Sequence, residues 1–558
     1  MSSLWTRIRS ILPRERMRKA DVVAGLPGAI GSVPDGMAAG VLAGVNPVYG
    51  LYASMAGPLF GGFATSTKLM VVTTTSASAL AAGSALSGVA PEDRQGALVL
   101  LTLIAGALMI AAAVLRLGRY TRFVSHSVMT GFLAGIAANI VFGQLPELLG
   151  ADVGGQFALS KALSVLFEFG SIDAASTIVG VLALVFMVTL ARTRLRLLAS
   201  LFALAIPTAL VLLLGWRSVK SVSEVGTIPT GIPVPALPEL SMLTPSVIGG
   251  AVAIAVIVLV QGAGVAEAAP NVDGSRSAPN KDFVAQGVGN VAAALFRGMP
   301  VGGSVGQTAL NIAAGARTRW AAIWSGIWML IILVAFAGLV GRVPMPTLAA
   351  VLIVAAAGSF DKGRIGAIWS SGYTSRIALV VTFVATLLLP VTAAVGVGVS
   401  LSLLLQLNQE ALDLKVVRLR VEGTRLVEGP APKDLADDEI AILDVYGSLF
   451  YAGARTLQTQ LPRPAGSRSP VVIIRLRGRT TVSATFLTVV ADYARRLNDV
   501  GGKLCLSGVD PQVRDSWTDA VLAAQGIRVE FFGAQPTVGA STLSAFAEAR
   551  IWVDDHRS

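Results

Sequence analysis

Apolar runs long enough to cross a bilayer fill most of the chain, from Val22 to about Leu407. A transmembrane helix needs about 20 consecutive, mostly apolar residues, because each residue advances the helix by only about 1.5 Å. The whole sequence is 54% hydrophobic and 14% charged, whereas soluble proteins are about 25% charged. These patterns predict an α-helical polytopic membrane protein.

About fourteen spans result when shorter runs beside Gly or Pro breaks are also accepted. Their predicted ranges are 22–43, 48–64, 70–88, 96–115, 123–146, 174–191, 197–215, 246–262, 282–296, 303–315, 320–340, 344–358, 377–389 and 391–408. After the last span, charged residues reach the density of a soluble protein. We therefore predict four parts: an N-terminal segment at 1–20, a transmembrane domain at 21–408, a linker at 409–437 and a soluble domain at 438–558.

Lys and Arg alternate between richer and poorer loops, as the positive-inside rule requires. The loops predicted to be cytoplasmic contain Lys68, Arg116, Arg119, Arg122, Arg192, Arg194, Arg196, Arg276, Lys281, Arg317, Arg319, Lys362, Arg364 and Arg376. The opposite loops contain fewer, namely Arg94, Lys161, Arg217, Lys220, Arg297 and Arg342. An even number of spans places both termini in the cytoplasm, and we expect a multi-pass protein of the inner (plasma) membrane.

The net charge of +11 is spread over these loops rather than gathered into one face, so nucleic acid is not an expected partner. One Cys and two His provide no metal-ligand cluster, and the sequence has neither a phosphate-binding loop nor a nucleophile elbow. We therefore predict no enzyme activity, no metal and no cofactor.

Two predicted spans begin abnormally. The third begins with the β-branched run from Val71 to Ser76, which favours extended backbone, and the tenth with Met299 to Ser304, where Pro and two Gly interrupt a helix. They lie seven spans apart, and interrupted segments at matching places in two halves point to a transporter's binding site. The candidate substrate-binding residues are Thr73, Thr74, Thr75, Ser76, Gly303, Ser304, Val305, Gly306 and Gln307. The alternative is that these small residues only pack helices together.

Asp35 follows Pro34 inside the first span, where an ionisable residue is costly and functional by default. We predict a role in coupling or substrate binding for Asp35. The alternative is a protonated carboxyl group that is hydrogen-bonded between helices.

The segment from Asn46 to Ser54, Asn-Pro-Val-Tyr-Gly-Leu-Tyr-Ala-Ser, is similar to a signature of the sulfate permease family of anion transporters. Further similarity covers Val128 to Leu145, Pro279 to Asn290 and Pro300 to Asn311. The stretch from Val445 to Ala452 then opens a pattern that resembles the STAS domain which follows the membrane part in that family.

The C-terminal pattern continues with a predicted strand at Val471 to Leu476, a helix at Thr485 to Leu497 and a strand at Lys503 to Ser507. It predicts a small cytoplasmic α/β domain. For the membrane part, the resemblance implies two inverted seven-span repeats, a core that moves against a gate, and a homodimer. It also implies a substrate held between the third and tenth half-helices, whose N-termini attract anions.

The membrane part of the sequence departs from the family at four positions. Many members have Arg where this chain has Gln307, preceded by a Ser where it has Gly306. The residue after the first-span Pro is commonly Gln and the eighth span commonly has Glu, whereas this chain has Asp35 and, counting back eighteen residues from Pro279, Gln261. We therefore predict that the carboxylate has moved to the symmetry-related helix, and that Asp35 and Gln261 are the coupling positions.

The leading prediction is a secondary active transporter of a small inorganic or organic anion that works by alternating access. Sulfate, bicarbonate, chloride and dicarboxylates all fit, with H⁺ or Na⁺ symport or with exchange. The alternatives are a passive anion channel and a nucleobase permease of the same fold; the STAS-like domain and the match from Asn46 to Ser54 count against the permease.

Overall fold

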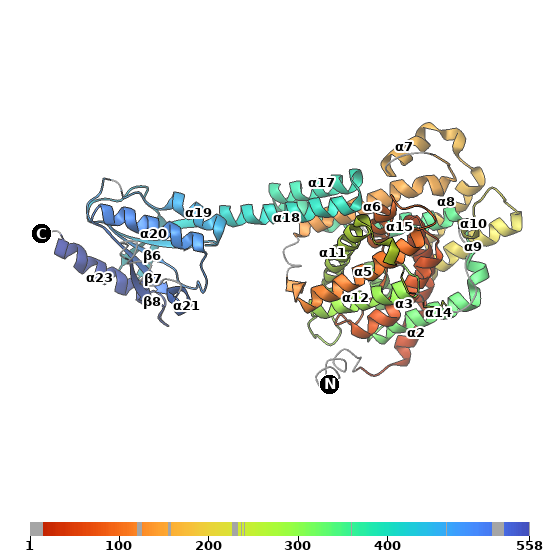
Figure 1. Ribbon diagram of the computed structural model, residues 1–558, viewed down its shortest axis with the longest axis horizontal. Helices are drawn as coiled ribbons and strands as arrows, with labels where there is room; N and C mark the ends of the chain where they lie inside the picture. Colours follow the sequence, from red (N-terminus) through yellow and green to blue (C-terminus); the bar gives the residue numbers. More distant parts are fainter. Residues whose placement is uncertain are drawn as a thin grey trace. The chain divides into compact units, whose positions relative to one another are not determined.

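The computed structural model describes residues 15–119, 125–153, 158–225, 233–235, 237–238, 240–358, 360–423, 425–464, 466–515 and 529–556. The chain divides into two compact units, Met1–Ser402 and Leu403–Ser558, which Figure 1 colours along the sequence. The boundary between the units falls inside α18 (Val391–Leu412).

Each predicted span corresponds, within the described residues, to a helix or to a short strand followed by a helix. One set of helices, which we name the core bundle, consists of α2 (Lys19–Leu42), α3 (Val48–Ala64), α4 (Ser76–Leu86), α5 (Arg94–Val114), α11 (Pro245–Ala268), α12 (Pro279–Leu295), α13 (Val305–Ala313) and α14 (Trp320–Val340). The gate bundle consists of α6 (His126–Leu149), α8 (Ala174–Leu190), α9 (Ala199–Leu214), α15 (Met345–Gly358), α17 (Tyr373–Leu388) and α18. The prediction of a helical polytopic fold is confirmed.

By length and composition alone, five helical stretches of the described chain can each cross a membrane: Arg94–Val114, His126–Leu149, Pro245–Ala268, Trp320–Val340 and Met345–Ser371. The other spans are shorter or more polar. The helices α7 (Ala158–Phe167), α10 (Val222–Val225) and α16 (Lys362–Ser371) lie in stretches that the span prediction treats as loops. A search for long apolar runs misses them because α7 and α16 have only 10 residues each and α10 has 4.

Helix packing repeats under a shift of seven spans. The contact of α2 with α14, spans one and eleven, has a counterpart in that of α11 with α5, spans eight and four. Likewise α3 packs on α14 as α12 packs on α5, and α6 packs on α17 as α15 packs on α8. Exchanging the two halves therefore maps one set of contacts onto the other, as two inverted repeats require.

The signature from Asn46 to Ser54 lies where two helices of the core bundle nearly touch. A Cβ atom added to Gly50 would lie 1.7 Å from the carbonyl oxygen of Gly36, so only glycine fits at this crossing of α3 with α2. The same signature accepts a hydrogen bond at the carbonyl of Tyr49 from Met299 N, over 3.3 Å. The signature therefore helps to position the segment that precedes α13.

The second unit is built on a six-stranded sheet in the order β4-β3-β5-β6-β7-β8. Its strands are β3 (Lys415–Glu422), β4 (Arg425–Pro430), β5 (Ile440–Tyr446), β6 (Val471–Arg475), β7 (Lys503–Val509) and β8 (Val529–Gly533). The last four run parallel. The accompanying helices are α19 (Tyr451–Gln460), α20 (Ala484–Asp499), α21 (Pro511–Asp515) and α23 (Ala540–His556).

Alternate residues of β6 face opposite sides of this sheet, as a strand requires. Val472 and Ile474 pack with α19 and α20, whereas Val471 and Ile473 pack with α23. Figure 1 shows α19 and α20 along one face of the sheet and α23 along the other. The predicted α/β domain is confirmed, with its strands and helix at the expected places.

Candidate functional site

Two short strands occupy the middle of the core bundle. β1 (Val72–Thr74) and β2 (Val301–Gly303) pair antiparallel, with Thr73 opposite Gly302 at the centre. Each has 3 residues, so the pair is about 10 Å long at about 3.3 Å per residue. The half-helices α4 and α13 start at opposite ends of this pair, so the predicted interruptions in the third and tenth spans are present.

Both half-helices begin with a capped N-terminus. The side chain of Thr75 accepts from Ser78 N, and that of Ser304 accepts from Gln307 N over 3.3 Å. The backbone N–H groups of Ser76, Ala77, Val305 and Gly306 have no hydrogen-bond partner within the described part of the chain. These donors, together with the positive ends of two helix dipoles, favour an anion.

Side chains from neighbouring helices satisfy the backbone of the strands. The Asn290 side chain of α12 donates to Val301 O over 2.7 Å and accepts from Val301 N over 3.0 Å, and Gln286 Oε1 accepts from Gly303 N over 3.1 Å. On the other strand, Ser54 Oγ of α3 lies 3.1 Å from Thr74 Oγ1 and 3.3 Å from Thr73 Oγ1. The structure therefore places the hydroxyl groups of these two predicted site residues against α3.

A buried carboxylate fixes the loop that leads into β1. Asp282 of α12 accepts hydrogen bonds from the side chain of Thr65 and from both the N–H and the hydroxyl groups of Ser66 and Thr67. Sequence reasoning did not select Asp282, Gln286, Asn290 or Ser54 as site residues. The sequence could have indicated them, because each is a polar residue inside an apolar span. A polar side chain that is buried there requires a hydrogen-bond partner.

The two predicted coupling positions meet the half-helices of the opposite repeat. Gln307 Nε2, in the first turn of α13, donates to Asp35 Oδ2 of α2 over 2.6 Å. Thr75, the cap of α4, lies 3.4 Å from Gln261 of α11, Oγ1 to Oε1. Since α2 and α11 are spans one and eight, and α13 and α4 are spans ten and three, the two contacts join equivalent helices of the inverted repeat.

The two predicted glycines of the tenth span have different surroundings. A Cβ atom on Gly303 would lie 2.9 Å from Met70 Sδ and 3.3 Å from Gly262 Cα, so this glycine permits close packing. A Cβ atom on Gly306 would meet nothing within 4 Å, and Val305 beside it is 52% exposed. The N-terminus of α13 therefore faces open space at Gly306.

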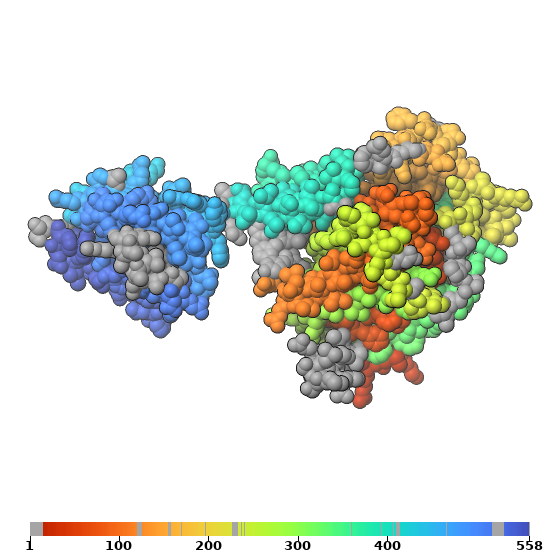
Figure 2. Space-filling model, in the orientation of Figure 1, coloured from red at the N-terminus to blue at the C-terminus, as the bar shows by residue number. Residues whose placement is uncertain are grey.

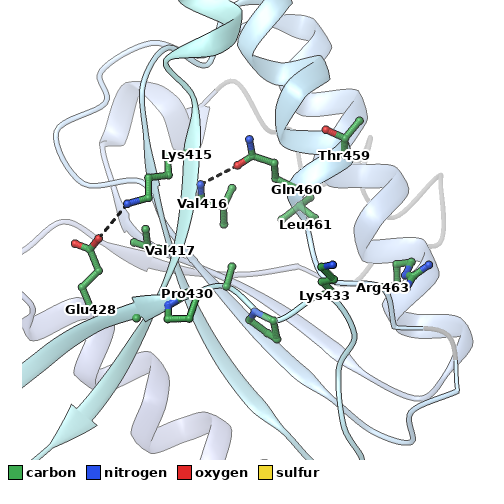
Figure 3. Close-up of a pocket in the computed structure, with 13 residues that line it drawn as sticks. Lys415, Val416, Val417, Glu428, Pro430, Lys433, Thr459, Gln460, Leu461 and Arg463 are labelled. Carbon is green, nitrogen blue, oxygen red and sulfur yellow. Dashed lines mark hydrogen bonds and ion pairs between the residues drawn. The ribbon is translucent and has the colours of Figure 1, made fainter.

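The second unit contains a hollow of about 860 Å³ between the β3–β4 hairpin and the end of α19. Figure 3 shows Lys415 directed at Glu428, and Gln460 bound to the backbone of Val416. Another cation at its rim, Arg463, is paired with Asp434. Two of the three cations that line the hollow therefore already have carboxylate partners, and the third is the exposed Lys433. The paired half-helix N-termini lie in the first unit, so we take that unit as the location of the candidate anion site.

The fold and the site define a helical membrane transporter with two inverted repeats, not an enzyme. A model of the sulfate permease family matches residues 19–385, and one of the STAS domain matches residues 432–539. The chain therefore belongs to the sulfate permease family, whose members transport anions across membranes, and it carries a STAS domain.

Known relatives cover most of the chain. The protein YvdB of Bacillus subtilis is 26% identical over 511 residues, which cover 89% of this chain and 92% of YvdB. Solute carrier family 26 member 10 of Mus musculus is 27% identical over 558 residues, 92% of this chain and 82% of that protein. The structure of murine solute carrier 26 family member A9, an anion transporter, is similar with a TM-score of 0.80 and 18% identity over 97% of this chain and 94% of that one. The last comparison shows the shared fold.

Replacing Asn290 by Ala should destabilise the strand pair strongly. The change leaves a buried N–H and a buried C=O of Val301 without partners, at about 1–3 kcal/mol each. We expect a marked loss of thermal stability of the purified protein in detergent. The matched control is Asn139→Ala, whose side chain makes one bond, to the carbonyl of Thr386. Equal melting temperatures for the two variants would show that Asn290 does not support the strands.

Adding bulk at Gly306 should block transport without unfolding the protein. A Leu side chain at this position enters open space at the N-terminus of α13, where it covers the free N–H donors. We expect Gly306→Leu to reduce anion uptake in proteoliposomes to background. Gly338→Leu places the same side chain in open space on α14 and should transport normally. Normal uptake by Gly306→Leu would move the site elsewhere.

Proposed function

We propose that the protein is a secondary active transporter that moves a small anion by alternating access and couples it to a cation through Asp35. The observation that carries this proposal is the pair of half-helix N-termini with one carboxylate hydrogen-bonded to the first turn of α13. Sulfate, bicarbonate, chloride and dicarboxylates remain the candidate substrates. A competition panel of these anions in proteoliposomes tests which one binds.

Charge balance at the site supports coupling. Each half-helix N-terminus is equivalent to about half a positive charge, so the two together offset one ionised carboxylate. With Asp35 ionised, an arriving anion brings an uncompensated negative charge into a low-dielectric region. A proton on Asp35, or a Na⁺ ion beside it, restores the balance. One cation at Asp35 therefore offsets one unit of the anion's charge.

Gln307 suits a proton-carrying partner better than an arginine does. An Arg beside Asp35 would favour the ionised carboxylate in every state. Gln307 Nε2 donates to the carboxylate, while its Oε1 is buried without a hydrogen-bond partner among the described residues. Rotating the amide by half a turn would present Oε1 as the acceptor for a protonated Asp35. The same residue thus stabilises both protonation states.

The contact between the two bundles supports movement of one against the other. A narrow gap of about 30 Å³ lies between α11 of the core bundle and α6, α17 and α18 of the gate bundle. Apolar side chains such as Phe132 and Val260 line it, the latter adjacent to Gln261 in sequence. Apolar contacts have no directional bonds, so packed helices can slide across each other. Sliding here would expose the site to alternate sides.

The proposal also includes the division of the chain into domains, its topology in the membrane and its assembly. The transport domain occupies 21–408 and the STAS domain 438–558, joined by the linker at 409–437. The protein lies in the inner membrane with both termini in the cytoplasm. It forms a homodimer. Concentrative uptake driven by an ion gradient distinguishes this transporter from a passive channel, and competition by nucleobases would favour the permease alternative.

Replacing Asp35 by Asn should abolish pH-dependent uptake, because the amide cannot take up the compensating proton. Adding Gln261→Glu should restore part of the response, since Gln261 occupies the equivalent place beside α4. The measurement is initial uptake into proteoliposomes with and without an inward proton gradient. An Asp35→Asn protein with an unchanged rate and pH profile would show that Asp35 is structural.

A further inference from the structure

The segment from Glu15 to Val22, which ends in the first turn of α2, lies along α14 and is bound there by three tryptophans. Trp320 Nε1 donates to Glu15 O over 3.0 Å, Trp324 Nε1 lies 3.2 Å from Met17 Sδ, and Trp328 Nε1 donates to Val22 O over 2.9 Å. Because the tryptophans are four residues apart, they follow one face of α14. Tryptophan is enriched at the boundary between membrane and water, so this segment is placed at headgroup depth.

The two acidic side chains of the segment already have partners, Glu15 in ion pairs and Asp21 in hydrogen bonds. The Glu15 carboxylate contacts Lys68 over 3.2 Å and Arg319 over 2.9 Å. Asp21 is fully buried and accepts from the N–H groups of Arg317 and Thr318 and from the Thr318 hydroxyl. Neither carboxylate therefore neutralises the outer surface of the segment.

The surroundings of the basic side chains are different. Arg16, Arg18, Lys19 and Arg317 are all exposed, and none of the four forms an ion pair with another described residue. Lys68 differs: its hydrogen bond to Asp273 lowers the pKa of that carboxyl, so its charge is already matched. Four unmatched positive charges therefore remain on this part of the surface.

Exposed apolar residues follow directly along α2. Val23 is 69% exposed and Leu26 is also exposed, although both belong to a helix of the membrane part. Val23 is four residues beyond Lys19, about 6 Å along the helix. Figures 1 and 2 show the start of α2, in red, at the lower edge of the first unit and on its surface. The positively charged residues and the exposed apolar residues are thus adjacent. Their arrangement matches that of a lipid, in which the charged headgroup is adjacent to the acyl chains.

We propose that Arg16, Arg18, Lys19 and Arg317, beside the three tryptophans, bind the headgroup of an anionic phospholipid whose acyl chains contact Val23 and Leu26. This site is independent of the transported anion and goes beyond the proposed function. Each Lys or Arg near an anionic membrane surface contributes about 1 kcal/mol, or about fivefold in affinity. A soluble phosphate would meet the same charges but not the apolar surface.

The test uses the purified full chain in mixed micelles of phosphatidylglycerol and phosphatidylcholine, with bound lipid counted by native mass spectrometry. The variant Arg16→Gln/Arg18→Gln/Lys19→Gln should bind phosphatidylglycerol at least about tenfold more weakly than the natural chain. The control variant Arg192→Gln/Arg194→Gln/Lys362→Gln removes the same charge from exposed residues elsewhere in the chain and should bind normally. Free glycerol phosphate should not displace the lipid.

Three results would overturn the proposal. Unchanged phosphatidylglycerol binding by the first variant would show that these residues are not the site. Equal weakening by the control variant would show a response to overall charge only. Displacement by glycerol phosphate at concentrations similar to the lipid's would assign the site to a soluble phosphate instead.

Discussion

The antiparallel pairing of β1 with β2 is the interaction on which the membrane unit depends. Inside a bilayer every backbone N–H and C=O needs a partner within the protein, so an extended segment there is unstable alone. Pairing satisfies one edge of each strand, and Asn290 and Gln286 satisfy part of the other edge of β2. Only because the strands are stable can α4 and α13 begin in the middle of the bundle, with free N–H groups.

That arrangement also explains why the site needs no cation of its own. Two helix N-termini supply positive potential without Lys or Arg, and Asp35 opposes it with one negative charge when ionised. The hydrogen bond from Gln307 to Asp35 joins the proposed substrate position directly to the proposed coupling position. On this account, binding of the anion and uptake of the cation are linked because they change the charge of the same small volume.

Sequence reasoning predicted the spans, both interruptions and the STAS-like domain, because hydropathy, β-branched runs and Pro–Gly breaks are local signals. It could not predict the pairing register of Thr73 with Gly302, nor that Asn290 supports β2, because these contacts join residues far apart in the chain. The packing role of Gly303 against Met70 likewise needs coordinates. Asp35 stood out as a charge in an apolar span, but its partner Gln307 is 272 residues away.

The central claim is that an anion lies at the N-termini of α4 and α13. Crystals of the full chain grown with bromide test it directly, because anomalous scattering locates bromide independently of the rest of the density. The account predicts an anomalous peak within hydrogen-bond distance of the backbone N–H groups of Val305 and Gly306, or of Ser76 and Ala77. Peaks confined to the basic loops or to the hollow of the second unit would contradict it.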